Sequence, residues 1–143
     1  MKKEPFVSLD PEEQLGYLLV RSANRLSLPW KAALRAHGIN PRQFGMLACL
    51  ARDPGLSQGE LARRVMITAQ SVGESLDVLF ASGHVQRDKG EPGRAAHLTL
   101  TARGRRLLAK AYPIVAKFER QRFACLTKAE RAELGRLLRK LDA

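Results

Sequence analysis

The chain has 143 residues, of which 45% are hydrophobic, so it can bury the core of one globular domain without disulfides or a metal. Lys and Arg number 25 against 14 Asp and Glu, and this net charge of +11 favours a polyanionic partner or a membrane surface. No apolar run reaches the ~18 residues that a membrane-spanning helix needs, which excludes such a helix.

The N-terminus and the cysteines point to a reducing compartment. The first residues, MKKEPFVSLDPEEQ, become acidic after two lysines and do not resemble a secretory signal, so we expect cytoplasmic residence. Cys49 and Cys125 lie far apart and form no C-x-x-C pair. The three histidines have no spacing that would converge on a metal, and we expect neither a metal nor another cofactor.

Helical periodicity dominates the first half. Asp10-Pro11 is a capping residue followed by proline, and it predicts a helix from there to about residue 36. Its apolar stripe consists of Leu15, Leu18, Leu19, Leu26 and Trp30. Asn40-Pro41 repeats the start signal and predicts a second helix with Phe44, Leu47 and Leu50 inward, ending at RDPG.

Residues 57 to 83 have helix-turn-helix spacing. Ser57 and Glu60 form a capping box that opens a short third helix, and Thr68 caps a fourth, which ends at Gly83. The apolar positions of the two helices are Leu61, Ala62, Val65, Val72, Leu76, Leu79 and Phe80. Two short helices with a tight connection are typical of a DNA-binding motif.

The remaining third predicts a hairpin and two helices. Residues 84–87 and 97–101 read as short strands joined by the polar segment DKGEPGRAA. Thr101 begins a long helix with Leu107, Leu108, Tyr112, Val115 and Phe118 inward. A second capping box at Thr127–Glu130 starts a final helix with a stripe of Leu134, Leu137, Leu138 and Leu141. The predicted fold is mainly α with a small β-hairpin.

Polar side chains of the fourth helix predict DNA contacts. The residues opposite its core face are Ala69, Gln70, Ser71, Gly73, Glu74 and Ser75. Gln70 can pair with adenine, and Ser71 and Ser75 can reach phosphate or base edges. Thr68 is first of all a helix cap. Glu74 would repel phosphate unless it accepts from cytosine or pairs with a nearby arginine, and both alternatives are open.

Basic residues extend the predicted DNA surface. Residues 84 to 106 carry six basic against two acidic residues, and a basic hairpin can follow a phosphate ridge or enter a narrow minor groove. The residues predicted to supply salt-dependent affinity for DNA are Arg87, Lys89 and Arg94. Arg63 and Arg64 are candidates for phosphate contacts, although each is equally plausible as a plain surface arginine. Ser57 and Gln58, at the start of the third helix, complete the predicted set.

The stretch INPRQFGMLACLARDPGLSQGELARRVMITAQSVGESLDVLFASGHVQR, with GRAAHLTLTARGRRLL after it, resembles the MarR family of bacterial regulators. The resemblance implies one domain over 1–143, a winged helix-turn-helix lobe at 40–101 and dimerisation helices at 9–37 and 102–143. It implies a homodimeric repressor on a pseudo-palindromic operator of double-stranded DNA, with half-sites about 10 base pairs apart. It identifies Arg94 as the wing-tip arginine. Pro92 stands where many members have an aspartate, with Glu91 adjacent.

The resemblance also implies control by a small aromatic acid bound between the dimer helices and the DNA-binding lobe. Arg21, Trp30 and Phe44 are the predicted pocket, because an arginine beside aromatic walls can pair bidentately with a carboxylate. A surface or interface role for Arg21 and core packing for the two rings are the alternatives. Redox control through Cys125 is a further alternative, whereas Cys49 reads as a small core residue.

No enzyme is expected, because no nucleophile with a base, no carboxylate pair and no phosphate-binding loop is visible. GEPGR lies between strands instead of opening a helix. The rival prediction is a protein-interaction module whose basic wing binds an acidic partner. The polar first turn of the fourth helix and Arg94 favour DNA, because protein-binding surfaces more often expose aromatic side chains.

Overall fold

The computed structural model describes residues 9–88 and 96–143. These residues form six α-helices and one antiparallel hairpin, as the sequence predicts, together with a short 3-10 turn that it does not predict. The helices are α1 (Leu15–Arg35), α2 (Pro41–Arg52), α3 (Gln58–Val65), α4 (Ala69–Ala81), α5 (Ala102–Arg122) and α6 (Lys128–Leu141). The strands are β1 (Val85–Asp88) and β2 (His97–Leu100), and the 3-10 turn is η1 (Pro11–Glu13).

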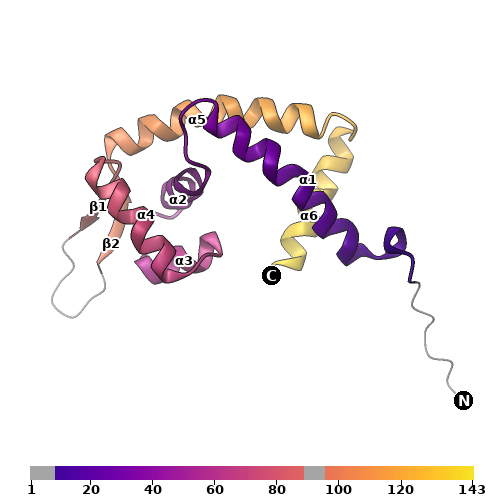
Figure 1. Cartoon of the computed structure of the whole chain (residues 1–143), viewed down its shortest axis with the longest axis horizontal. Coiled ribbons are helices and arrows are strands. Elements are labelled where there is room, and N and C mark those ends of the chain that lie inside the picture. Colours follow the sequence, from indigo (N-terminus) through magenta and orange to yellow (C-terminus); the bar gives the residue numbers. More distant parts are fainter. Residues whose placement is uncertain (1–8, 89–95) are drawn as a thin grey trace, which may run out of the picture.

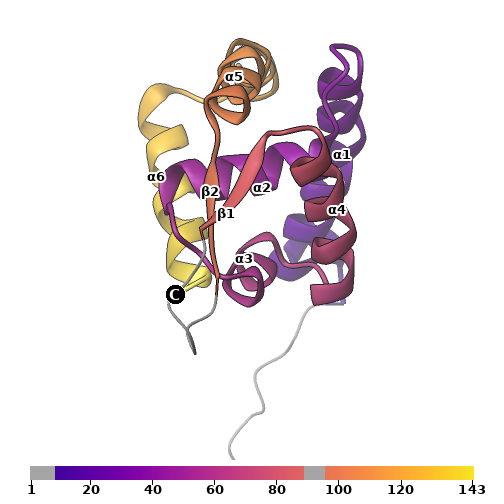
Figure 2. The same ribbon diagram turned by 90° about the vertical axis from the view of Figure 1, so that its left-hand side faces the viewer.

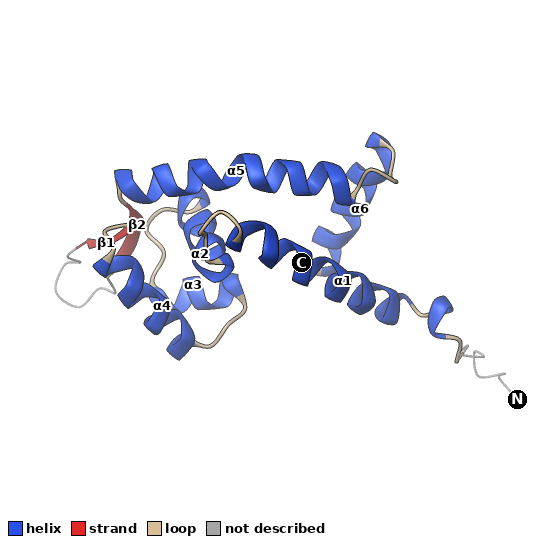
Figure 3. Ribbon diagram, turned by 45° about the horizontal axis from the view of Figure 1, so that its top comes forward, coloured by secondary structure: helices blue, strands red, loops and turns tan. Residues whose placement is uncertain are grey.

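The helices are arranged around α2. Helix α5 runs along one side of the molecule, and α3, α4 and the hairpin gather on the other side of α2 (Figures 1 and 2). Helix α1 extends away from this lobe toward the N-terminus, and α6 turns back from the far end of α5 (Figure 3). The lobe formed by α2, α3, α4 and the hairpin is therefore connected to the helices α1, α5 and α6, whose surfaces are less covered by the rest of the chain.

Local capping signals set most helix starts. The side chains of Asn40, Ser57, Thr68, Thr101 and Thr127 each accept a backbone N–H from the first turn of α2 to α6, and Ser57 and Thr127 close full capping boxes. In both boxes, hydrogen bonds to the capping residue lower the pKa of the glutamate, Glu60 or Glu130.

The predicted start of the first helix at Asp10-Pro11 is wrong. Asp10 does cap, but it accepts from Glu12 N over a single 3-10 turn, and Gln14 then takes an extended conformation. The Gln14 N–H bonds to Pro11 O, which closes the turn, so α1 begins only at Leu15. The turn places Glu12 beside Arg21.

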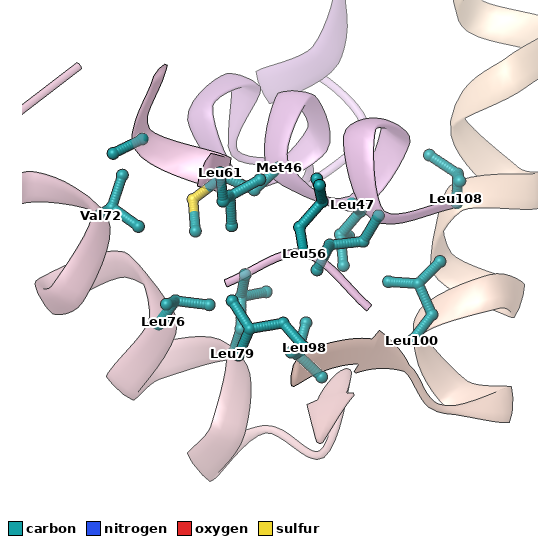
Figure 4. Packing of buried hydrophobic residues seen from close by; sticks show 13 residues of the cluster. Met46, Leu47, Leu56, Leu61, Val72, Leu76, Leu79, Leu98, Leu100 and Leu108 are labelled. Atoms are coloured by element: carbon teal, nitrogen blue, oxygen red, sulfur yellow. The ribbon is translucent and has the colours of Figure 1, made fainter. Parts of the chain in front are cut away.

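The core of the lobe is a cluster contributed by α2, α3, α4, the hairpin and α5 (Figure 4). Leu61, Val72 and Leu79 are completely buried in it, and Leu98 of β2 reaches the same cluster. A second cluster of Leu34, Ile39 and Ala111 joins α1 to α5, with Trp30 and Phe44 packed against it. These clusters fix the position of α4 relative to α2 and α5.

The inward position predicted at Tyr112 is wrong. Ala111 is buried instead, and Tyr112 is 51% exposed. Successive residues of a helix are ~100° apart, so the turn that places Leu108 and Ala111 against the core carries Tyr112 to the flank. Leu15, Leu19, Leu137, Leu138 and Leu141 of the predicted stripes are also exposed in the single chain.

The hairpin is tied to the lobe on two sides. Val85 pairs with Leu100 and Asp88 with His97, and Leu98 also forms a bridge with Leu56 before α3. On the far side, the start of α5 lies directly against β1. A Cβ on Gly104 would lie 2.0 Å from His84 O, so only glycine fits this approach.

Candidate nucleic-acid interface

The first turn of α3 lies beside the second turn of α4. Ser57 uses its side chain to cap Glu60 N, which leaves Gln58 at the helix start with its own side chain free to turn toward α4. Gln58 Nε2 lies 3.1 Å from the position that a Cβ on Gly73 would occupy. The glycine therefore allows Gln58 to lie against α4, a role that the sequence does not reveal at Gly73.

The first two turns of α4 present the polar residues that the sequence singled out. Thr68 Oγ1 accepts from Ser71 N, so its hydroxyl serves as the cap. Ser75 Oγ donates to Ser71 O at 3.0 Å, which occupies its proton within the helix. Gln70 Nε2 donates to Glu74 Oε1 at 3.4 Å. Glu74 is thus partnered by a residue of its own helix, and an arginine partner is not seen among the described residues.

The base of the hairpin faces the start of α3. Arg87 of β1 lies with its guanidinium 5.0 Å from the centre of the Phe80 ring, a cation–π contact that holds the side chain at the strand. Arg87, Ser57, Gln58 and Leu98 line a hollow of about 280 Å³. The predicted contacts Lys89 and Arg94, and the neighbours Glu91 and Pro92, lie outside the described residues.

The two arginines at the end of α3 differ. Arg64 forms an ion pair with Asp53, which follows α2, and so ties α3 to the preceding loop. Arg63 is exposed and makes no ion pair in the described part of the chain. The Arg63 guanidinium can therefore bind a phosphate directly, whereas Arg64 would first have to leave Asp53.

More than half of the surplus positive charge of the chain lies on α5. Arg103, Arg105 and Arg106, counted with the hairpin in the sequence, belong to α5. Residues 40–101 hold seven Lys and Arg against six Asp and Glu, a net charge of only +1. Helix α5 holds seven against one, which gives it +6 of the chain's +11.

Of the three residues predicted for a ligand pocket, Trp30 and Phe44 come together, whereas Arg21 lies two and a half turns earlier on α1 and is paired with Glu12. Trp30 packs edge-on against Phe44, with ring centres 5.8 Å apart, and against Phe118 at 5.2 Å. Arg21 is bound through both terminal nitrogens to the Glu12 carboxylate. Hydrogen bonding to Arg21 lowers the pKa of Glu12, so that carboxylate is ionised at neutral pH.

A hollow beside α4 holds cations that the sequence reasoning missed. Its volume is about 390 Å³, and its wall includes Lys31 and Arg35 of α1, Arg42 of α2, and Glu74 and Val78 of α4. None of the three cations makes an ion pair within residues 9–88 and 96–143. The four-residue spacing of Lys31 and Arg35, which places both on one helix face, was the available signal.

Comparison with known proteins shows to which family the chain belongs. The profile of the MarR family matches residues 37–95. The HTH-type transcriptional repressor Rv2887 of Mycobacterium tuberculosis (strain ATCC 25618 / H37Rv) is 37% identical over 138 residues, which cover 96% of this chain and 99% of the relative. The chain belongs to the MarR family.

Solved structures of MarR proteins have the same fold. Rv2887 in complex with salicylic acid matches with a TM-score of 0.74 at 38% identity, covering 90% of this chain and 96% of that one. Rv2887 in complex with DNA matches with a TM-score of 0.75 at 36% identity, covering 91% and 98%. The transcriptional repressor CouR, bound to a 23-mer DNA duplex, matches with a TM-score of 0.83 at 27% identity, covering 98% and 100%.

Membership of the MarR family makes the chain a transcription regulator of the winged helix-turn-helix fold, and the family is not a class of enzymes. Within the described residues, no helix is long and apolar enough to cross a membrane, and no group of His, Cys, Asp and Glu is arranged to hold a metal. Cys49 is half-buried against the core, and burial raises the pKa of its thiol. Cys125 is exposed after α5.

Proposed function

We propose that the protein is a homodimeric repressor that binds a pseudo-palindromic operator through α3, α4 and the hairpin, and that a small aromatic acid releases it. The observation that carries the proposal is the shared face formed by the start of α3, the first turns of α4 and the base of β1. Relatives with this fold are seen bound to DNA. Action on the chromosome places the protein in the cytoplasm.

Base reading in this proposal falls to the start of α4. Gln70 is exposed, and its bond to Glu74 is long enough to be exchanged for a bidentate pair with adenine. When Gln70 turns to a base, Glu74 is free to accept from a cytosine amino group. Ser71 and Ser75 then contribute van der Waals and phosphate contacts, with Thr68 holding the helix start in place.

Phosphate contacts in this proposal come from the hollow between α3 and β1. The first N–H groups of α3 have no partner within the helix, and the Arg87 guanidinium lies at the other wall. A phosphate between them would be held from two sides, with Ser57 and Gln58 at its edge. Arg63, and Lys89 and Arg94 of the hairpin tip, extend this contact, whereas Arg64 would first have to leave Asp53.

The dimer in this proposal buries the exposed apolar side chains of the long helices. Leu15 and Leu28 of α1 and Leu141 of α6 are each more than 70% exposed in the single chain. Residues 9–37 and 102–143 thus serve as the dimerisation part, and residues 40–101 as the DNA-binding lobe of a single domain. Two lobes related by a two-fold axis then bind two half-sites.

For the effector, the hollow beside α4 suits a carboxylate better than Arg21 does. Arg21 already binds a carboxylate of its own chain. Lys31, Arg35 and Arg42 surround a space of about 390 Å³ next to Glu74, and Pro41 and Val78 supply apolar contact for a ring. An acid bound there would lie against the recognition helix and compete with its fit to DNA. A relative is seen with salicylic acid.

Footprinting on the intergenic region beside the gene tests the DNA proposal. We expect one protected region with two-fold symmetry, and we expect Gln70→Ala to weaken its binding by roughly tenfold or more. Leu28→Gln, at an exposed apolar position of α1, should affect dimerisation instead. Salt-sensitive binding with no sequence preference would sink the proposal in favour of a protein-interaction module with an adventitious affinity for DNA.

Titration with salicylic acid tests the effector proposal. The acid should release native protein from the operator, and Arg35→Gln/Arg42→Gln should need a much higher concentration. Arg21→Ala is the matched control and should respond as the native protein does. If Arg21→Ala lost its response to the acid to the same extent, the effector site would be assigned to Arg21 with Trp30 and Phe44. If peroxide treatment abolished DNA binding by the native protein but not by Cys125→Ser, the result would support redox control instead.

A further inference from the structure

Helix α5 carries a continuous row of cations on one exposed flank. Its members, which we call the α5 stripe, are Arg103, Arg106, Lys110, Lys117 and Arg120. Their spacings along the helix are three, four, seven and three residues, all of which keep side chains near one face of a helix, and Pro113 stands in the gap between Lys110 and Lys117. All five are exposed, and none makes an ion pair or hydrogen bond in the described part of the chain.

The other exposed flank of α5 is of a different kind. Ala109, Tyr112 and Ala116 lie there and are exposed in the single chain, after Arg105, whose guanidinium donates to Leu100 O. Glu119, the only acidic residue of α5, is also on this flank by helical spacing. Small and aromatic side chains suit the close approach of a second chain, so dimerisation would cover this flank and leave the α5 stripe in solvent.

The α5 stripe lies away from the DNA-reading face. Helix α3 lies on the side of α2 away from α5, and α4 lies beside α2 (Figure 2). Arg103, the first member of the stripe, is close to Gly83 at the end of α4, and the later members follow along α5 away from the lobe. A duplex bound at the start of α4 would therefore not reach the later members of the α5 stripe. Residues 40–101 carry a net charge of only +1, so the largest concentration of positive charge in the chain lies outside the proposed DNA-reading lobe.

We propose that the α5 stripe binds the phosphate backbone of a second DNA duplex, so that an operator-bound dimer can hold two segments of DNA together. This inference goes beyond the proposed function, and it rests on the latter only for the operator-bound state. The α5 stripe extends over about 25 Å of helix, which corresponds to roughly seven base pairs of duplex.

The chemistry of the stripe favours DNA over other polyanionic partners. The row includes Pro113 and is bordered by Leu107 and Ile114, but these two aliphatic side chains are partly buried against the core and leave no apolar anchor exposed among the five cations. A protein partner would need such anchors, and an interfacial membrane helix would need an apolar face to insert. Phosphates are bound through charge and counterion release alone, without sequence preference.

The first test is a titration of a fluorescent duplex that lacks the operator, followed by anisotropy over a range of KCl concentrations. The variants are Arg103→Gln/Arg106→Gln/Lys110→Gln on the α5 stripe and Arg131→Gln/Arg139→Gln/Lys140→Gln on α6, which removes the same charge. We expect the α5 variant to lose roughly tenfold or more in affinity near 0.1 M salt and about 2.7 in the salt slope. Equal losses in the two variants would overturn the proposal.

The second test asks whether two duplexes are held at once. Native dimer is bound to immobilised operator, and retention of a second, fluorescent duplex is measured. Native and α6-variant protein should retain it, whereas the α5 variant should bind the operator normally and retain little. Retention by all three proteins, or by none, overturns the inference, while failure of native protein to bind the operator counts against the proposed function alone. If the α5 variant lost binding to phosphatidylglycerol vesicles but kept its binding to the duplex, the α5 stripe would be assigned to membranes instead.

Discussion

At the scale of single residues, Gly104 shows how closely α5 approaches the hairpin. His84 O occupies the space that any side chain at this position would need. The sequence contains a glycine in a helix start and gives no sign that it matters, because the contact joins residues 20 positions apart. The caps at Ser57, Thr68 and Thr101 were predictable from the sequence, since each bond forms within three residues.

Gly104→Ala should lower the free energy of unfolding by about 1–3 kcal/mol or more, because the backbone of β1 or α5 must move to admit the methyl group. The measurement is urea unfolding followed by circular dichroism. Gly45→Ala in α2 is the control, because no atom lies within 4 Å of the added Cβ. It should stabilise by about 0.5–1 kcal/mol through helix propensity. A similar result for both variants would refute the close approach.

His84 gives the fold a defined dependence on pH. Burial, and then the nearby charge of Arg103, lower the pKa of its imidazole below the ordinary value. The unfolded chain therefore binds the proton more tightly, so stability is complete above the unfolded pKa of ~6.5 and falls as the pH drops below it. Unfolding at pH 7.5 and 5.5 should show a smaller loss for His84→Gln than for the native protein. An unchanged loss would mean that other groups cause it.

At the scale of elements, the long helices are built for a partner that one chain does not contain. The stripes of α1 and α6 were predictable from helical spacing, but their exposure was not, because periodicity does not say which molecule covers an apolar face. Tyr112 is the clearest example: the apolar pattern favoured an inward position, and the helix places it on the uncovered flank. The partner of Arg21 was not predictable for a related reason, since Glu12 comes to Arg21 through a 3-10 turn that the sequence pattern read as helix.

Leu138→Glu/Leu141→Glu should raise the dimer dissociation constant by roughly 100-fold or more, because each buried leucine contributes about 1.5–3 kcal/mol. Sedimentation velocity over a concentration series measures the change. Lys140→Glu on the same helix introduces the same side chain at a polar position and should leave the dimer nearly intact. A dimer unaffected by the double variant would exclude the end of α6 from the interface.

At the scale of the whole molecule, charge and recognition are separated. The lobe that faces DNA is nearly neutral, and it presents amide and hydroxyl groups from α3 and α4 together with Arg87 of β1. The surplus charge lies on the long helices, above all α5. The total of +11 indicated a polyanionic partner correctly, but only the three-dimensional arrangement shows that most of this charge lies far from the recognition helix.

The measurement that tests the central claim most directly is the ratio of affinities for the footprinted operator and a scrambled duplex of equal length, at about 0.15 M salt. For the native protein we predict a ratio of roughly 10³ or more, a lower ratio for Gln70→Ala, and an unchanged operator affinity for Arg131→Gln. Equal affinities of the native protein for the two duplexes would contradict recognition through α4.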